Sequence, residues 1–546
     1  MIKLLSLSIC FVLLSAANLL ASVFYADPSL GNSRNTGTSA SPWKTLQEVL
    51  DSAKIETRMY AVKPFSPGAA MVAKNAGAPV KAGDTIMLRN GYHGAIFASE
   101  YYNSDYITIM AQPGQKPWIA NLELRSGCKW RVKGLFISPE KAPVYQVKTL
   151  INFASHSWTG ESYDCIAEAC SCYSVIDDSR WTEKDWDTLS CDAMSLPGTR
   201  MVARGNYFHN VNFGISVDGD SCLVERNTIN HFASDGLRGL GDYDTFQYNT
   251  VKNCLAINDN HDDGFQSWSV GAGGVGTGVV KGMVLRGNTI INYEDPAMPF
   301  KGTMQGIGCF DGMFEDWLIE NNVVLVDHWH GITLLGAKNC TIINNTVGDV
   351  NTIDPGPPWI YIGDHKDSTH SSGCVIRNNL STAYIMGQGV LADHNITYSN
   401  YNTFFVDYAH LDMRLKAGCA AVDSGSPALA PAIDIAGISR PQGNAVDVGA
   451  HELPRIAVET VPVRTAPGYL DVNPSPFNSA TVIRFANPDG NASLVVFDIT
   501  GKVVARSGLI HGDGFTWNAG NQPCGVYIIR LEAGKEIITR SVCLER

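Results

Sequence analysis

The sequence predicts an all-β chain: a parallel β-helix, in which short strands coil into a solenoid, with a capping helix before it and a small β-sandwich after it. Three observations support this prediction. A motif with a central Asn recurs every 21 to 23 residues along part of the chain. Short apolar segments with Gly at their bends follow each motif, and alternating segments joined by Gly turns fill roughly the last eighty residues.

The repeated motif reads VARGNYF, VERNTI, FQYNTV, LRGNTI, IENNVV, IINNTV and IRNNLS. Its Asn residues are Asn206, Asn227, Asn249, Asn288, Asn322, Asn345 and Asn379. A period just above twenty with short strands is typical of a parallel β-helix, and the Leu-x-x-Leu-x-Leu signature of leucine-rich repeats is absent. We expect the Asn side chains to stack as an amide ladder at a tight bend, where Asn also tolerates a left-handed backbone.

The two ends of the chain carry different signals. Residues 1–22 read as a secretory signal peptide, with Lys3 before an apolar run and small residues near its end. Ser41 is a good N-cap and Pro42 fits the first helical position of a capping helix. We expect the β-helix domain to span 23–453, a linker 454–468, and the sandwich 469–546.

Composition limits the possible partners. The chain has 546 residues, is 45% apolar and has a net charge of −12, which argues against a nucleic-acid partner. After the signal, no apolar run is long enough to span a membrane, so we expect an exported monomer without a membrane span. An acidic ligand would need a locally positive site.

Fourteen cysteines include Cys10 in the signal segment, which leaves thirteen. One group lies in a polar, irregular insertion and is a candidate for disulfides in an oxidising compartment: Cys165, Cys170, Cys172 and Cys191. Another group holds similar places in successive turns, and we expect it to point inward as small apolar side chains: Cys222, Cys254, Cys340 and Cys374.

A second column of residues precedes a Gly in each turn: Phe213, Asp235, Asp263, Gln305, His330 and Gln388. The Gly marks a bend, so the residue before it should project from the same edge of every turn. We therefore expect Asp235, Asp263, Gln305 and His330 to line one outer groove.

Acidic and amide side chains are concentrated between residues 234 and 268. Asp235, Asp262, Asp263 and Asn260 are candidate ligands for Ca²⁺, which takes six to eight oxygen ligands. A calcium ion here could act on a substrate or only join two turns, and Asp-rich turns also occur without metal. The sequence leaves these alternatives open.

Other side chains near this cluster could contact a ligand. Lys301 precedes the bend at Gln305 and should overlook Asp263, and Arg238 could pair with a carboxylate or contact substrate. His261 and His330 are candidate acid–base groups or hydrogen-bonded structural histidines. The indole rings expected beside the groove, where they could stack on sugars, are those of Trp268, Trp317 and Trp329.

Three parts of the chain resemble known families. FYADPSLGNSRNTGTSASPWKTLQ and the Asn-ladder turns resemble extracellular right-handed parallel β-helix proteins of the pectate-lyase type. SDGL followed by DNHDDGFQSW resembles the family 9 polysaccharide lyases, which implies that Asp235, Asp262 and Asp263 bind calcium and that Lys301 is the base. Gln266 stands where that family has a further carboxylate, and we assign it to substrate binding. The tail, from NPSPFNSATVIRFANP to GVYIIRLEAG, resembles a type IX secretion sorting domain.

The resemblance implies a secreted polysaccharide lyase that cleaves uronic-acid-containing glycans by calcium-assisted β-elimination with a lysine base. The chain would meet a secretion machinery or attach to the cell surface through its tail. A glycoside hydrolase using a pair from Asp235, Asp262 and Asp263 is one alternative. A non-catalytic glycan-binding surface protein is another, because fold alone does not select between them.

Overall fold

The computed structural model describes residues 21–351, 353–454, 470–485, 492–510, 514–533 and 536–545. The chain forms two compact units, residues 1–455 and 456–546. The predicted signal peptide, apart from residues 21 and 22, and the predicted linker, apart from residue 454, lie outside the described residues.

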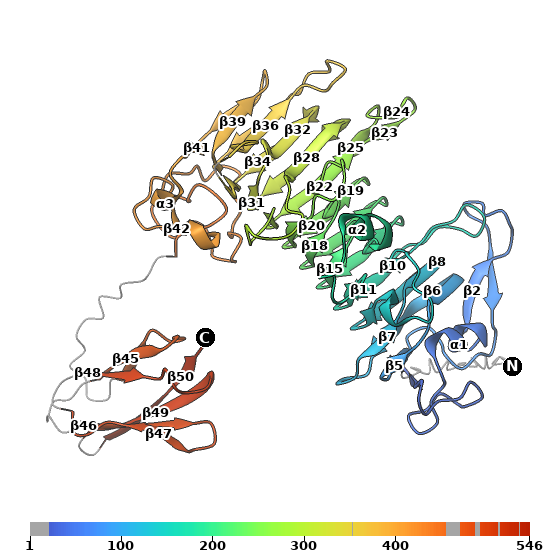
Figure 1. The fold of residues 1–546 in the computed structure, drawn as a ribbon, viewed down its shortest axis with the longest axis horizontal. Helices are drawn as coiled ribbons and strands as arrows, with labels where there is room; N and C mark the ends of the chain where they lie inside the picture. Colours follow the sequence, from blue (N-terminus) through green and yellow to red (C-terminus); the bar gives the residue numbers. More distant parts are fainter. Residues whose placement is uncertain are drawn as a thin grey trace, which may run out of the picture. The chain divides into compact units, whose positions relative to one another are not determined.

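The first unit is a coil of short parallel strands (Figure 1). Within its 22-stranded sheet each strand pairs with the strand one turn further along: β14 (Val202–Arg204) with β17 (Leu223–Glu225), and β17 with β20 (Thr245–Gln247). A 12-stranded parallel sheet forms a second wall. Side chains alternate along these strands, apolar toward the interior and polar outward. The predicted parallel β-helix is confirmed.

Two sets of strands matter below. The first, in the larger sheet, is β16 (Ile215–Val217), β19 (Leu237–Gly239), β22 (Asp263–Trp268), β28 (Gln305–Asp311), β32 (His330–Leu335), β36 (Trp359–Gly363) and β39 (Ala383–Met386). The second, in the smaller sheet, is β12 (Ser171–Tyr173), β15 (Tyr207–Val211), β18 (Thr228–Phe232), β21 (Thr250–Cys254), β27 (Thr289–Ile291), β31 (Val323–Val326) and β35 (Thr346–Asp349).

The asparagine ladder forms as expected. The side-chain amide and the backbone N–H of Asn249 both donate to Oδ1 of Asn288 at 3.0 Å, and Asn288 repeats this with Asn322 at 3.0 and 2.9 Å. The ladder runs one turn beyond the prediction, to Asn395. The left-handed backbone belongs to the residue before each ladder Asn, such as Tyr248 with φ 55°, and this corrects the expectation for Asn itself.

The capping helix α1 (Leu46–Asp51) begins later than predicted. Its N-cap is Thr45, whose hydroxyl accepts from the N–H of Glu48 at 3.2 Å. Ser41 instead forms a β-bridge with Thr38, so it cannot start the helix. The apolar side of α1, including Leu46, is buried in the core of the β-helix.

The thirteen cysteines between residues 128 and 543 are free thiols, so the disulfides expected in an insertion do not form. Cys165, Cys170, Cys172 and Cys191 are part of the buried core rather than of an irregular excursion. The inward-facing cysteines expected in successive turns are buried as predicted: Cys222, Cys254, Cys340 and Cys374.

The second unit consists of two antiparallel sheets. One contains β44 (Leu470–Asn473), β45 (Ala480–Phe485) and β48 (Gly514–Asn518); the other contains β46 (Ala492–Asp498), β47 (Val503–Arg506), β49 (Gly525–Ala533) and β50 (Glu536–Leu544). Ile483, Leu494, Trp517 and Ile529 share its core, which confirms the predicted small sandwich. No helix among the described residues is long and apolar enough to cross a membrane.

Candidate functional site

The predicted outer column forms at the start of consecutive strands of the larger sheet. Asp263 pairs with Gln305, and the backbone N–H of Asp263 donates to Oδ1 of Asp235 at 3.2 Å. His330 begins β32, the next strand along, and pairs with Trp359. The column then continues to Ala383, not to Gln388, which lies beyond the end of β39. We call Asp235, Asp262, Asp263 and Gln305 the acidic column.

The carboxylates of the acidic column are buried. Asp235, Asp262 and Asp263 are exposed by 3%, 5% and 0%. Burial raises the pKa of Asp262 to about 8, and the neighbouring charge of Asp235 adds to this. Burial and the charge of Asp235 also raise the pKa of Asp263 well above its ordinary value. Buried carboxyl groups this close together need a proton or a cation to share the site.

Two oxygen atoms of the acidic column have no hydrogen-bond partner among the described residues: Oδ1 of Asp263 and Oε1 of Gln305. Both approach Gly308, where an added Cβ would lie 2.3 Å from the first and 2.9 Å from the second. The missing side chain at Gly308 therefore lets two buried acceptor oxygens pack against this part of the strand. The other carboxylate oxygen of Asp263 accepts from Nε2 of Gln266 at 2.9 Å.

Arg238 fixes Asp235 from the outer face of β19. Its Nη2 donates to Oδ2 of Asp235 at 2.5 Å. The guanidinium lies between two rings, 4.4 Å from the centroid of Phe213 and 4.8 Å from that of Trp268. This arrangement suits a planar arginine and holds one positive charge at the edge of the acidic column.

His330 is surrounded by aromatic rings. It packs edge to face with Phe310 and Trp359, at centroid distances of 4.8 and 5.2 Å, and stacks on His328. Its Nδ1 hydrogen-bonds with the hydroxyl of Thr333 at 3.0 Å. Burial, with the nearby His328, lowers the pKa of His330 to about 4, so its imidazole is neutral near pH 7.

Three predicted site residues are exposed and lie on loops. Lys301 places its Nζ 4.8 Å from the ring centroid of Tyr293 and 3.1 Å from the carbonyl oxygen of Pro296. These contacts are with its own loop and not with the carboxylates of the acidic column. Its backbone bridges to Leu255, in the segment that leads to Asp262.

His261 is exposed, and its imidazole lies close enough to Asp235 to offset a small part of the rise that burial causes in the pKa of that carboxyl group. Asn260 is exposed as well, and its amide reaches Oδ1 of Asp262 only at 3.5 Å. These two residues therefore lie on the outer side of the acidic column.

The aromatic predictions divide. Trp268 lines the site over Arg238, and Trp329 is exposed by 43%. Trp317 was expected beside the groove, but it is buried in the core, where its indole N–H donates to the carbonyl of Val280 at 2.9 Å. The sequence pattern did not identify Trp359, because no Gly follows it. It did not identify Gly308 either, because the column is defined by the first glycine of QGIG, which is Gly306. An isolated Gly within a strand is the signal of a close approach.

Within the part of the chain that the structure describes, no group of three or more His, Cys, Asp or Glu side chains converges as a metal site. The donor chemistry of the acidic column still fits a hard cation, because the unpartnered carboxylate and amide oxygens beside Gly308 are ligands of the kind that Ca²⁺ takes. Further oxygen atoms would have to complete such a site.

Residues 193–354, which include the acidic column, match the family model described as right handed beta helix region. The first unit is a right-handed β-helix. Residues 471–545 match the secretion system C-terminal sorting domain. The protein is therefore secreted or carried to the cell surface. Its C-terminal sorting domain is the part that a secretion machinery recognises.

Three solved structures are similar to this chain over most of its length. The structure titled pectate lyase Pel9A is 15% identical with a TM-score of 0.37, covering 79% of this chain and 96% of its own. A complex of XylC with xylose is 10% identical, TM-score 0.40, covering 90% and 95%. The GH136 lacto-N-biosidase from Eubacterium ramulus is 12% identical, TM-score 0.39, covering 69% and 68%. No curated protein matches the sequence.

Proposed function

We propose that the first unit is a polysaccharide lyase that cleaves uronic-acid-containing glycans by β-elimination at the acidic column. The observation that carries this proposal is the pair of buried acceptor oxygens beside Gly308, from Asp263 and Gln305, that have no donor among the described residues. A buried carboxylate left without a partner is costly, so a positive charge is the natural complement.

Calcium is the cation we propose, held by Asp235, Asp262, Asp263 and Gln305, with Asn260 at the outer edge. When bound, the ion would supply positive charge that offsets the carboxylate of a uronate and makes its neighbouring C–H more acidic. Because the described side chains do not converge as a complete metal site, we expect substrate oxygens to complete the coordination. Calcium should therefore bind more tightly when the glycan is present.

The protein's own residues would then divide the remaining work. Arg238 holds Asp235 in place and presents its charge between Phe213 and Trp268, at the edge where an acidic sugar would enter. Gln266 keeps Asp263 oriented by its amide hydrogen bond. His330, neutral near pH 7, can accept or donate a hydrogen bond to sugar hydroxyls.

We assign the base to Lys301, whose exposed amine lies on the loop that enters β28. It would take the proton at C5 of the uronate while the C4–O bond breaks, leaving a C4–C5 double bond. A water molecule would protonate the departing oxygen, which becomes a free hydroxyl on the released sugar. His261, on the neighbouring loop that leads into β22, would contact the glycan as well.

The test is absorbance near about 235 nm, where an unsaturated uronate product absorbs, on pectate, alginate and glycosaminoglycans, with calcium or with a chelator. We expect calcium-dependent growth on one class, loss of it in Lys301→Ala, and its retention in Lys281→Ala. Lys281 is a matched control because it lies near Glu315, at 3.9 Å, away from the column. Absence of the signal on every uronate polymer would contradict the lyase.

A glycoside hydrolase is the second candidate, and the raised pKa of Asp262, about 8, favours it. A carboxyl group that keeps its proton near pH 7 can act as a general acid on a glycosidic oxygen, with Asp235 as the second carboxylate. New reducing ends without absorbance, unaffected by chelator, would establish this reaction instead. Binding without either signal would identify a non-catalytic glycan-binding protein.

A further inference from the structure

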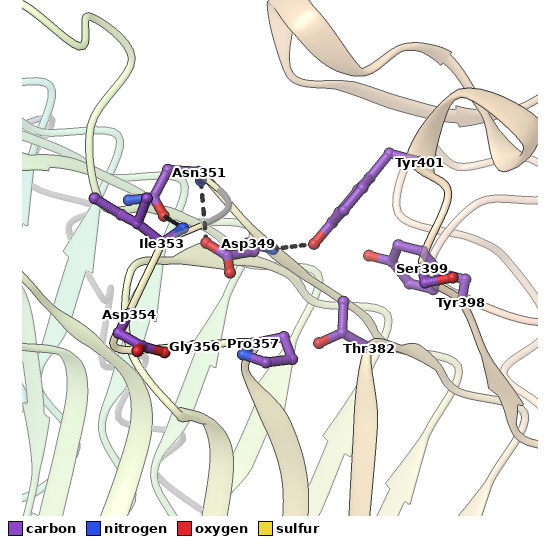
Figure 2. A pocket seen from close by; sticks show the side chains of 10 residues that line it. All are labelled: Asp349, Asn351, Ile353, Asp354, Gly356, Pro357, Thr382, Tyr398, Ser399 and Tyr401. Carbon is purple, nitrogen blue, oxygen red and sulfur yellow. Dashed lines mark hydrogen bonds between the residues drawn. The ribbon is translucent and has the colours of Figure 1, made fainter.

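A separate cavity of about 310 Å³ lies on the same β-helix, at the turns that lead into β36 and β39 (Figure 2). Its lining includes Asp349, Asp354, Pro357, Thr382, Ser399 and Tyr401. Asp349 ends β35, and Thr382 immediately precedes β39. The volume falls at the lower end of the range for small-molecule sites in proteins.

Asp349 is held rigidly at one wall of this cavity. It is only 4% exposed, its Oδ1 accepts from the N–H of Asn351 at 3.0 Å, and its own N–H donates to the hydroxyl of Tyr401 at 3.2 Å. Its Oδ2 accepts no hydrogen bond from any described residue and lies where a Cβ on Gly356 would come within 2.6 Å. A fixed and buried carboxylate thus offers one free acceptor to whatever enters.

The other walls supply hydroxyl groups and apolar surface. Figure 2 shows Thr382 and Ser399 on the side of the cavity opposite Asp354. The ring of Tyr401 is fixed by stacking on Tyr408, with ring centroids 3.9 Å apart. Hydroxyl groups both donate and accept, carboxylates accept, and tyrosine and proline offer apolar faces to C–H groups.

The charge of the lining restricts the ligand. The lining holds carboxylates from Asp349 and Asp354 and no Lys, Arg or His. Such a lining repels a uronate, which carries its own carboxylate. A neutral sugar ring fits instead, because its hydroxyls can donate to the free oxygen of Asp349 and to the hydroxyl of Thr382, whose own hydrogen goes to the carbonyl of Pro358. They can also exchange hydrogen bonds with Ser399.

We propose that this cavity is a binding site for one neutral sugar ring, distinct from the acidic column. It lies on the same edge of the β-helix, since Trp359 pairs with both His330 and Ala383 in successive turns. The site could hold an uncharged sugar of a glycan whose acidic part lies at the column, yet the cavity binds a free sugar whether or not the column is catalytic.

The test is saturation-transfer NMR on the full secreted chain with free glucose, galactose, rhamnose and xylose, beside galacturonate and Ca²⁺ alone. We expect at least one neutral sugar to bind, Asp349→Asn to weaken it about tenfold through loss of a charge-assisted hydrogen bond, and galacturonate not to bind at the cavity. Ser399→Ala, an exposed change that leaves folding intact, should weaken binding about threefold.

The matched control is Asp367→Asn, an exposed carboxyl group on the loop after β36 that is not part of the lining, and it should leave binding unchanged. The proposal is overturned if no neutral sugar binds, or if Asp349→Asn and Ser399→Ala both bind as well as the unaltered chain. If the unaltered chain binds Ca²⁺ in the absence of sugar and Asp349→Asn abolishes that binding, the proposal is also overturned, and the cavity is a cation site. None of these outcomes depends on whether the acidic column cleaves a glycan.

Discussion

Two stacks of polar side chains run through the same turns of the β-helix, and they differ in how far their hydrogen bonds are satisfied. In the asparagine ladder, Asn249 and Asn288 each donate twice to the next residue and also bond to a backbone carbonyl. In the acidic column, Asp263 and Gln305 keep oxygen atoms without a donor among the described residues. A complete stack stabilises the coil, whereas an incomplete one leaves binding capacity for a ligand.

The largest effect should come from Asp263→Asn. Losing the negative charge beside the proposed cation should reduce lyase activity about 1000-fold, about 4 kcal/mol of transition-state stabilisation. Stability should not fall, because burial and the charge of Asp235 raise the pKa of Asp263 and so favour its neutral form, which the amide resembles. Initial rates and urea unfolding measure the two effects. Asp316→Asn, which changes an exposed carboxyl group, is the control. If Asp263→Asn keeps activity within tenfold of the unaltered enzyme, the assignment is contradicted.

Asn288→Ala should give the opposite pattern. It leaves the N–H and amide of Asn249 without their acceptor and removes a donor to Asn322, so we expect the free energy of unfolding to fall by about 3 kcal/mol. Activity per folded molecule should be unchanged. Asn258→Ala, at an exposed position, should cost less than about 0.5 kcal/mol in the same urea titration. If both variants lost the same free energy of unfolding, the ladder would stabilise the coil no more than an exposed amide does.

Arg238→Lys sharpens the account of how the acidic column is held. A lysine keeps the charge but cannot fill the planar gap between Phe213 and Trp268, so kcat/KM should drop about tenfold, or about 1.4 kcal/mol. Arg226→Lys is the comparison, because Arg226 packs on one ring only, that of Tyr248. If both changes are silent, the two-ring clamp does not position Asp235.

The smallest effect concerns pH. The folded protein lowers the pKa of His330 to about 4, below the ordinary 6.5, so its neutral form is favoured. Above pH 6.5 both folded and unfolded states hold it neutral; as pH falls from 6.5 toward 4 the unfolded state takes up the proton first, and stability is lost.

Allowing for the partial exposure of the ring, we expect about 1 kcal/mol of this loss to disappear in His330→Gln. Urea unfolding between pH 7 and pH 4 measures it. The same curves for Asn288→Ala should run parallel to those of the unaltered protein, because the ladder carries no charge. If the stability of His330→Gln falls with pH as steeply as that of the unaltered protein, the pKa of this histidine does not change on folding.

Periodicity explains how much the sequence could predict. The ladder and the column residues Asp235, Asp263, Gln305 and His330 repeat once per turn, so their neighbours follow from spacing alone. The position of Lys301 did not follow, because it lies on a loop whose path depends on the contacts of Tyr293 and Pro296. Trp317 was misplaced because an indole can face either side of a strand, and the interior of the coil had room for it.

The cavity beside Asp349 carried no sequence signal for a related reason. Its walls come from residues 349, 351, 353, 354, 356 and 357, from Thr382, and from residues 398, 399 and 401. These share no motif and meet only when the coil is closed. Gly356 is one of many glycines in the chain, and only its distance from Oδ2 of Asp349 distinguishes it. Such a site is defined by three-dimensional proximity.

The stacking of strands also spaces the side chains of this surface at regular intervals along the coil axis. Each turn advances by the spacing of neighbouring strands, about 4.8 Å, so Asp263 on β22 and Trp359 on β36, three turns apart, are separated by about 14 Å along the coil axis. One sugar unit of a polymer has a length comparable with one turn. A glycan lying along this edge would therefore meet a new row of side chains with almost every residue, and adding or deleting one turn would shift its reading frame by one sugar.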